Sequence, residues 1–313
     1  MGALIVHLVV YAAVGVFLLA VAVRFFKIIR MPLHLRWELY PVAHEAGARA
    51  KYGGSHLEEL NWWTKKQEKS RFNELKVMIP EMVFMVALFE HNRKLWWRSF
   101  PFHFGLYILA GFIGLLVLGA VMELPQVRIG LTGGVGLVVY YLTHAAFIAG
   151  MGLATLGALM LLERRLFDPE LKAYSSFGHI FNLIFFLAVF AVAWLTYLIA
   201  DPTFSLTRNF IASLLPLPSA FNLTAEIGHP LLALELVLAV LLVAYIPLTH
   251  MSHFFIKWFT YHKVRWEDEP NFRGGEIEKK VIEQVQYPVT WSASHLNADG
   301  KKNWVDIATE EMK

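Results

Sequence analysis

Long apolar stretches alternate with charged ones along the chain, and the apolar stretches set its architecture. A helix needs about 20 apolar residues to cross about 30 Å of hydrocarbon. Five stretches qualify as transmembrane helices: Ala3–Val23, Phe102–Met122, Val135–Leu162, Phe177–Ala200 and Pro230–Phe255. The third is longer than a crossing requires, which indicates a tilted helix or one that extends past the bilayer. We therefore predict an all-α, polytopic membrane protein.

Polar segments divide the chain around these helices. Residues 1–23 are predicted as the first transmembrane helix, residues 24–101 as a cytoplasmic segment, residues 102–255 as a four-helix transmembrane bundle and residues 256–313 as a cytoplasmic tail. The first helix ends directly in basic residues and lacks the cleavage site of a signal peptide, so we expect an uncleaved anchor.

Basic residues are distributed unevenly among the loops, and this predicts the orientation. The segment 24–101 holds 14 Lys and Arg residues, the loop 163–176 holds 3 and the tail from residue 256 holds 9, whereas the other two loops hold one each. Since Lys and Arg are retained in the cytoplasm, the N-terminus should face outward and the C-terminus inward. We expect a multi-pass protein of the cell inner (cytoplasmic) membrane.

Two polar stretches carry aromatic residues that suit a membrane surface or a partner. Residues 80–98 begin with a proline and end in a basic run with Trp96 and Trp97, which is typical of a helix at the headgroup level. The alternative is an ordinary amphipathic helix that leads into the second span. The tail is too short and polar for a self-sufficient domain, so we expect it to dock on a partner subunit.

Composition narrows the chemistry. The chain is 57% hydrophobic and contains no cysteine, which excludes disulfides, cysteine-ligated zinc and cysteine-ligated iron–sulfur clusters. Any redox centre must therefore be bound by histidine or methionine. The net charge of +3 follows the membrane topology, and we expect no nucleic-acid partner.

Six histidines lie in or near the predicted spans, where an ionisable side chain usually has a partner or a role. They are His103, His144, His179, His229, His250 and His253. Haem b needs two neutral imidazoles that reach the iron from opposite sides, normally from two helices of a bundle. The alternative for each is a histidine that only hydrogen-bonds within the bundle or at the headgroups.

Four of these histidines form two candidate pairs when their predicted depths in the membrane are compared. His103 begins the second span and His253 ends the fifth, both at the cytoplasmic side, so their depths match. His229 and His144 lie toward the outer side. They match less well, because His144 is about ten residues deep, or roughly 15 Å at 1.5 Å per residue.

Other polar residues near the fifth span have their own interpretations. His250 precedes His253 by three residues, so on a helix both would share a face, and Pro247 is expected to kink that helix. We interpret His179 and His250 as pocket-lining residues or contacts to a haem propionate. Glu235, inside the fifth span, is a candidate proton relay, with a carboxylate paired to a neighbouring helix as the alternative.

Two motifs resemble a known family. Trp96–Gly105 (WWRSFPFHFG) is similar to the start of the ligand-bearing second helix in the gamma (cytochrome b) subunits of respiratory nitrate reductases. Ile246–His253 (IPLTHMSH) resembles the Pro-x-Thr-x-x-x-His end of their fifth helix. The likeness covers roughly residues 95–260. The long first cytoplasmic segment and the tail motif PVTWSASHL indicate the branch of heterodisulfide-reductase-like complexes of the sulfate-reducer type.

The resemblance implies which residues would bind haem b. The histidine of each motif falls where the family ligates its cytoplasmic-side haem, which implies that His103 and His253 form this pair. The second haem of the family does not carry over, since its ligand positions hold Ile113 and Glu235 here. The pair of histidines toward the outer side could rebuild a haem nearer the outer face, so we expect one haem and leave two open.

The resemblance also implies a function in electron transfer. The chain would be the haem b subunit of a quinone-linked respiratory complex, with menaquinone or another quinone on one side and a cytoplasmic iron–sulfur subunit of the heterodisulfide-reductase type on the other. Two alternatives stay open: a haem-free membrane anchor, and a transporter subunit whose histidines relay protons, which the lack of an inverted repeat disfavours. The quinone, the direction of electron flow, the partner's substrate and the oligomeric state are not evident from the sequence.

Overall fold

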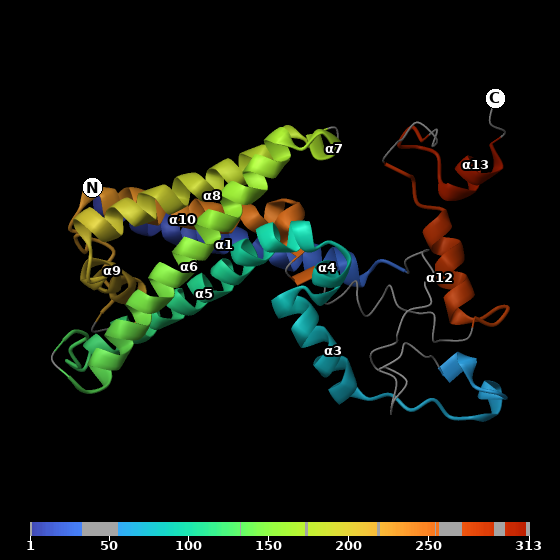
Figure 1. The fold of residues 1–313 in the computed structure, drawn as a ribbon, viewed down its shortest axis with the longest axis horizontal. Coiled ribbons are helices and arrows are strands. Elements are labelled where there is room, and N and C mark those ends of the chain that lie inside the picture. The colour runs from blue at the N-terminus through green and yellow to red at the C-terminus, as the bar shows by residue number, and fades with distance from the viewer. Residues whose placement is uncertain are drawn as a thin grey trace. The chain divides into compact units, whose positions relative to one another are not determined.

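The computed structural model describes residues 2–32, 56–131, 133–172, 175–217, 220–253, 255–256, 271–290 and 298–310. Within these ranges the regular elements are helices, an isolated bridge joins Pro288 to Asn303, and there is no strand. Five described helices are long and apolar enough to cross a membrane: α1 (Gly2–Ile29), α5 (Arg93–Glu123), α6 (Gly134–Phe167), α8 with η3 (Phe177–Ala200) and α10 with η4 (Pro230–Leu248) (Figure 1). The prediction of an all-α polytopic membrane protein is confirmed.

Shorter elements connect and flank these helices. They are η1 (His56–Glu58), η2 (Trp62–Thr64), α3 (Arg71–Phe84), α4 (Val86–His91), α7 (Pro169–Lys172), the π-helical η3 (Thr196–Ala200), α9 (Ser205–Leu214), η4 (Ile246–Leu248), η5 (His250–Ser252), α12 (Glu276–Val285) and α13 (Trp304–Thr309). The chain divides into two compact units. One comprises residues 1–19 and 80–249, and the other comprises residues 20–79 and 250–313.

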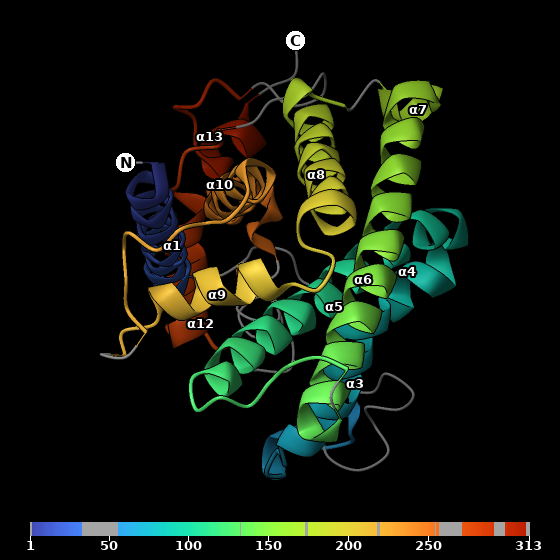
Figure 2. The same cartoon turned by 90° about the vertical axis from the view of Figure 1, so that its left-hand side faces the viewer.

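In the first unit the spanning helices pack in chain order. α5 packs along α6, α6 against α8, and α8 against α10 (Figure 2). The start of α1 joins α9 and α10 through a buried apolar cluster: Val6, Val10, Phe210, Ile227 and Leu232. α9 lies crosswise to the spanning helices, at the end of the bundle where α1 begins.

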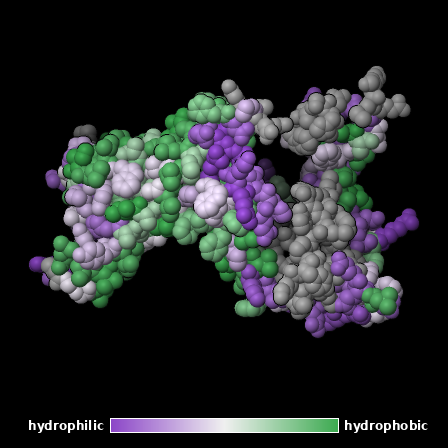
Figure 3. Space-filling model, viewed as in Figure 1, coloured by the Kyte–Doolittle hydropathy of each residue, from purple (hydrophilic) through white to green (hydrophobic). Residues whose placement is uncertain are grey.

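The spanning helices expose apolar side chains that water-soluble proteins bury. No more than 33% of the most apolar window of any span is buried, and exposed apolar residues occur along all five helices. Figure 3 shows hydrophobic residues over much of the visible surface of the spanning helices. Since so much exposed apolar surface requires an apolar solvent, the chain is a multi-pass membrane protein.

Small residues let α5 and α6 approach closely. A Cβ added to Gly105 would lie 2.7 Å from the Gly150 carbonyl oxygen, and one added to Gly157 would lie 2.7 Å from the Cα of Phe102. Glycines at such positions let the backbones of membrane helices meet, where van der Waals packing drives association. This contact fixes the first half of α5, on which His103 lies.

Replacing Gly157 with alanine is expected to push α5 away from α6, because the new Cβ would overlap the Phe102 backbone. We expect a loss of about 1–3 kcal/mol, the range for overpacking. Gly152→Ala on the same helix is the control, since a Cβ there meets nothing within 4 Å. Thermal unfolding in detergent measures both variants, and equal melting temperatures would contradict the close packing.

The segment before α5 is not one continuous helix. α3 ends because Met85 adopts a left-handed conformation with φ 52°, and Asn92 caps the start of α5 with its side chain. The spanning helix therefore begins at Arg93 rather than at the predicted Phe102. Residues 93–98, with the paired tryptophans, form the start of α5, as the alternative of a helix leading into the second span predicts. A position of this segment at the headgroups stays a prediction.

Side chains of α5 satisfy the carbonyl groups at the end of α3. The Trp96 Nε1–H donates to the Phe84 carbonyl oxygen at 2.7 Å, and the Tyr107 hydroxyl donates to that of Met82 at 3.0 Å. The last carbonyls of a helix have no intrahelical partner. These bonds therefore fix the end of α3 against the spanning helix.

The fifth span is shorter than predicted. α10 ends at Tyr245 and continues only as η4, so the span ends at Leu248 rather than at Phe255. The predicted break at Pro247 is confirmed, since proline removes a backbone donor and clashes with the preceding turn. His250 lies in η5, so the α-helical face that it was predicted to share with the next histidine is absent.

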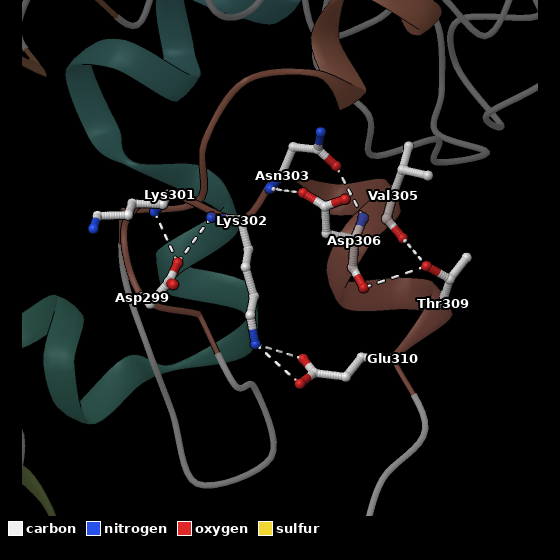
Figure 4. Close-up of polar contacts among 8 residues, drawn as sticks. All are labelled: Asp299, Lys301, Lys302, Asn303, Val305, Asp306, Thr309 and Glu310. Atoms are coloured by element: carbon white, nitrogen blue, oxygen red, sulfur yellow. Dashed lines mark hydrogen bonds and ion pairs between the residues drawn. The ribbon is translucent and has the colours of Figure 1, made fainter.

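The described part of the tail has local structure of its own (Figure 4). Asp299 accepts hydrogen bonds from the N–H groups of Lys302 and Lys301 at 2.8 and 2.9 Å, which lowers the pKa of its carboxyl. Asn303 and Asp306 cap the start of α13 reciprocally. Most of the tail motif at 288–296 lies outside the described residues, and docking of the tail on a partner stays a prediction.

Candidate functional site

His103 lies in the first half of α5, and its Nδ1 atom contacts the preceding turn of the helix. Its Nδ1 atom lies 2.8 Å from the Ser99 carbonyl oxygen, one turn earlier. Because a carbonyl oxygen can only accept, Nδ1 carries the proton and Nε2 the lone pair. Histidines that bind metals usually donate their other N–H in this way, which orients the ring and selects the tautomer. The contact with Ser99 therefore orients the ring of His103 and selects its tautomer.

Beyond Tyr107, which is exposed one turn after His103, the same face of α5 carries small residues. Ala110, Gly111 and Gly114 are exposed, and a Cβ added to either glycine would meet nothing within 4 Å. The donor nitrogen and the open helix surface therefore fit a haem bound to α5.

His253 lies in the second unit, directly after η5. It is exposed, and its Nδ1 atom lies 3.2 Å from the His250 carbonyl oxygen, the same ring arrangement as in His103. Arg24, near the end of α1, donates from Nη1 to the buried Ser252 hydroxyl at 2.7 Å. The end of α1 thus fixes η5, which directly precedes His253.

His144 is enclosed by aromatic rings in the first unit. Its ring centroid lies 4.1 Å from that of Tyr140 and 5.1 Å from that of Phe204. Its Nδ1 atom lies 2.8 Å from the Tyr140 carbonyl oxygen, and its Nε2 atom lies 3.0 Å from that of Pro202. Because both nitrogens face carbonyl oxygens, the geometry favours the hydrogen-bonded alternative over iron binding.

His229 and His179 both cap helices through Nδ1. The Nδ1 of His229 accepts from the Leu231 N–H at 3.1 Å at the start of α10, and that of His179 accepts from the Ser176 N–H at 3.1 Å at the start of α8. A nitrogen that accepts is unprotonated, so in each neutral ring the proton lies on Nε2. That tautomer donates hydrogen bonds from Nε2 and does not present it to iron.

Glu235 lies half-buried on α10, close to the loop between η3 and α9. Thr196 and Asp201 are the polar side chains that interact with it. Asp201 is only 2% exposed and accepts from the N–H groups of Leu206 and Thr207 at 3.2 and 2.8 Å, which caps the start of α9. The structure thus brings the predicted relay residue to a second carboxylate that the sequence analysis did not single out.

Arg208 and Glu123 form an ion pair that the sequence analysis missed. The Nε of Arg208 lies 3.1 Å from one carboxylate oxygen and its Nη2 lies 3.0 Å from the other, while Nη1 donates to the Thr203 carbonyl at 2.9 Å. The Arg208 side chain is 3% exposed. Gly119 leaves room for it, since a Cβ there would lie 2.7 Å from the Arg208 Cδ. The available signal in the sequence was Glu123, a carboxylate directly after the predicted second span.

His7 is a second residue that the sequence analysis did not single out. It is 0% exposed, and its Nε2 lies 2.8 Å from the Ser213 hydroxyl on α9, while its Nδ1 lies 2.8 Å from the Ala3 carbonyl oxygen. The Tyr11 hydroxyl donates to the Leu214 carbonyl at 2.6 Å. These contacts tie α1 to α9 at the end of the bundle that also holds the Arg208 ion pair.

Comparison with known proteins gives one match. The family model described as nitrate reductase gamma subunit matches residues 86–267. That range contains α5 to η5, and with them all the histidines considered above except His7. No curated protein and no solved structure matches the chain.

Proposed function

Because the chain belongs to the nitrate reductase gamma subunit family, haem b membrane subunits of respiratory complexes, we propose that it passes electrons between a membrane quinone and a cytoplasmic iron–sulfur subunit. The observation that carries the proposal is the ring of His103, whose Nδ1–H is engaged by the Ser99 carbonyl at 2.8 Å. His103 and His253, both within the matched range, would hold haem b. When bound, haem b supplies the one-electron redox chemistry.

The proposal is for one haem per chain. In both His103 and His253 the Nδ1 atom lies near a backbone carbonyl oxygen. In this tautomer Nε2 would be the atom of each ring that holds the iron. The rings of His144 and His229 use their nitrogens for other bonds. A second haem at that pair would need both rings to give up these contacts.

Quinol oxidation releases two protons with its two electrons, so a quinone site needs groups that accept protons. Glu235, with Thr196 and Asp201 as its polar neighbours, supports a site at the end of the bundle where α9 lies. The loops at the end of the bundle where α9 lies hold few Lys and Arg residues, whereas the other loops hold many. This distribution supports an outward orientation of that end in the inner membrane. We therefore propose that Glu235 takes up a proton from the quinol, which is menaquinol or a related compound.

The proposed partner is an iron–sulfur subunit of the heterodisulfide-reductase type. Residues 24–85 and 268–313 lie outside the matched range, and their length and the PVTWSASHL motif support this branch. The polar tail also exposes apolar side chains, namely Phe272, Ile282, Tyr287 and Val305. Such residues on a polar segment suit burial against a protein subunit.

A spectrum of the purified full-length protein in lipid nanodiscs tests the proposal. We expect a b-type band in the reduced-minus-oxidised difference spectrum, and we expect a menaquinol analogue to produce that band without dithionite. A b-type band that quinol does not produce would refute the quinone part. No band from a haem-supplied preparation would leave the anchor or the proton-relaying transporter.

Arg24 is expected to act as a positioning residue for the proposed ligand His253. Arg24→Ala removes the donor to Ser252, so η5 is no longer fixed to α1. We expect haem retention to fall about tenfold, the lower end of the range for groups that orient a metal ligand. Arg24→Lys should restore part of it. Lys27→Ala, which removes a cation from the same helix end, is the control. A Soret band and a haem content unchanged in Arg24→Ala would contradict this role.

A further inference from the structure

A charged cavity of ≈ 430 Å³ lies where α5 begins and α6 ends. Its lining residues are Asn92, Lys94, Arg98, Glu163, Arg164, Phe167 and Asp168. This volume falls in the range of small-molecule sites. The charged residues directly flank apolar spans, so the cavity lies at the depth where a bilayer has its headgroups.

The charged side chains of the cavity differ in whether another side chain already pairs with them. Arg164 and Asp168 form a close pair at 3.2 Å. Arg98 and Glu163 lie 3.7 Å apart, with 56% of the Glu163 side chain exposed. Within the part of the chain that the structure describes, the exposed ammonium of Lys94 is paired with no carboxylate. The cavity thus offers two cations and one carboxylate to a ligand.

An apolar surface continues from this cavity along α6. Leu159 and Leu156 lie four and seven residues before Glu163, so the three share one helix face. Both leucines are half exposed, at 50% and 52%. Phe167, at the cavity itself, is 74% exposed. A molecule with a charged head and an apolar chain would therefore contact both parts at once.

We propose that this cavity binds a zwitterionic phospholipid that carries a primary ammonium group. The phosphate lies against Lys94 and Arg98, the ammonium lies against Glu163, and an acyl chain lies along Leu159 and Leu156. Basic sites between spanning helices bind lipid headgroups. The carboxylate selects the zwitterionic head, because Glu163 would repel a head that is only anionic.

Native mass spectrometry of the full chain tests this proposal. The protein is offered equal amounts of phosphatidylethanolamine and phosphatidylglycerol with the same acyl chains. We expect wild type to retain the ethanolamine lipid, and Glu163→Gln to retain the glycerol lipid instead. Lys94→Ala should lower retention about tenfold, as expected for loss of a charge-assisted bond. Arg93→Ala is the control, because its guanidinium lies over the Phe89 ring, 4.6 Å from the centroid, and outside the cavity.

Two results would overturn the proposal. One is an unchanged lipid preference in Glu163→Gln together with unchanged retention in Lys94→Ala. The other is displacement of the lipid by millimolar inorganic phosphate or glycerophosphoethanolamine, which would show a site for the head alone. Persistence of the bound lipid in the presence of both small compounds is the expected result.

Discussion

His103→Ala is expected to yield a folded membrane protein with almost no haem b. The alanine removes the imidazole that the Ser99 carbonyl orients through Nδ1 at 2.8 Å. Of the two histidines that would hold the haem, only one would then remain. Haem per chain, measured by the pyridine haemochrome method, should fall from about one to near zero. Circular dichroism and gel filtration should match wild type, because His103 is only half-buried.

His144→Ala and His229→Ala are the matched controls for this prediction. Their rings hydrogen-bond to Pro202 and Leu231 respectively, so we expect both variants to keep the haem of wild type. A loss of haem in the controls with retention in His103→Ala would reassign the site to the other end of the bundle. A drop from about two haems to one in either control would show the second haem that the proposal leaves out.

The spans could be predicted because their signal is local and redundant. Any stretch of about 20 apolar residues must cross or avoid a bilayer, and each span has many such residues, so single errors do not matter. The ends were less predictable, since one residue decides them. Met85 takes a left-handed conformation that ends α3, and Asn92 starts α5 with a side-chain cap. Neither residue differs in hydropathy pattern from its neighbours.

The candidate site also contains residues that the local sequence predicts and residues that it does not. His103 stood out because a histidine at a span end is rare and a motif surrounds it, and the helix geometry that engages its Nδ1 follows from its position alone. The cluster around residues 201–204 depends on contacts that come from α5, α6 and α9. Arg208 therefore looked like a topology signal only, because its partner Glu123 lies 85 positions away in sequence. Pairing at such distances cannot be inferred from one sequence.

Arg208→Met is expected to destabilise the protein by about 3 kcal/mol, near the lower end of the range for breaking a buried pair. The lower end applies because the Glu123 side chain is 28% exposed, so water can reach part of its charge. Arg208 also donates to the Thr203 carbonyl, and this acceptor would lose its partner. The variant should therefore loosen the loop that joins η3 to α9.

The double variant Arg208→Met with Glu123→Leu separates the cost of an unpaired charge from the value of the pair. Replacing a buried pair by apolar groups is often neutral or stabilising, so we expect the double variant to recover to within about 1 kcal/mol of wild type. Arg164→Ala, which breaks the more exposed pair with Asp168, should cost less than about 1 kcal/mol. Thermal unfolding in detergent measures all three. Additive losses in the double variant would mean that Arg208 and Glu123 stabilise the bundle independently, and that packing rather than charge explains the effect of Arg208.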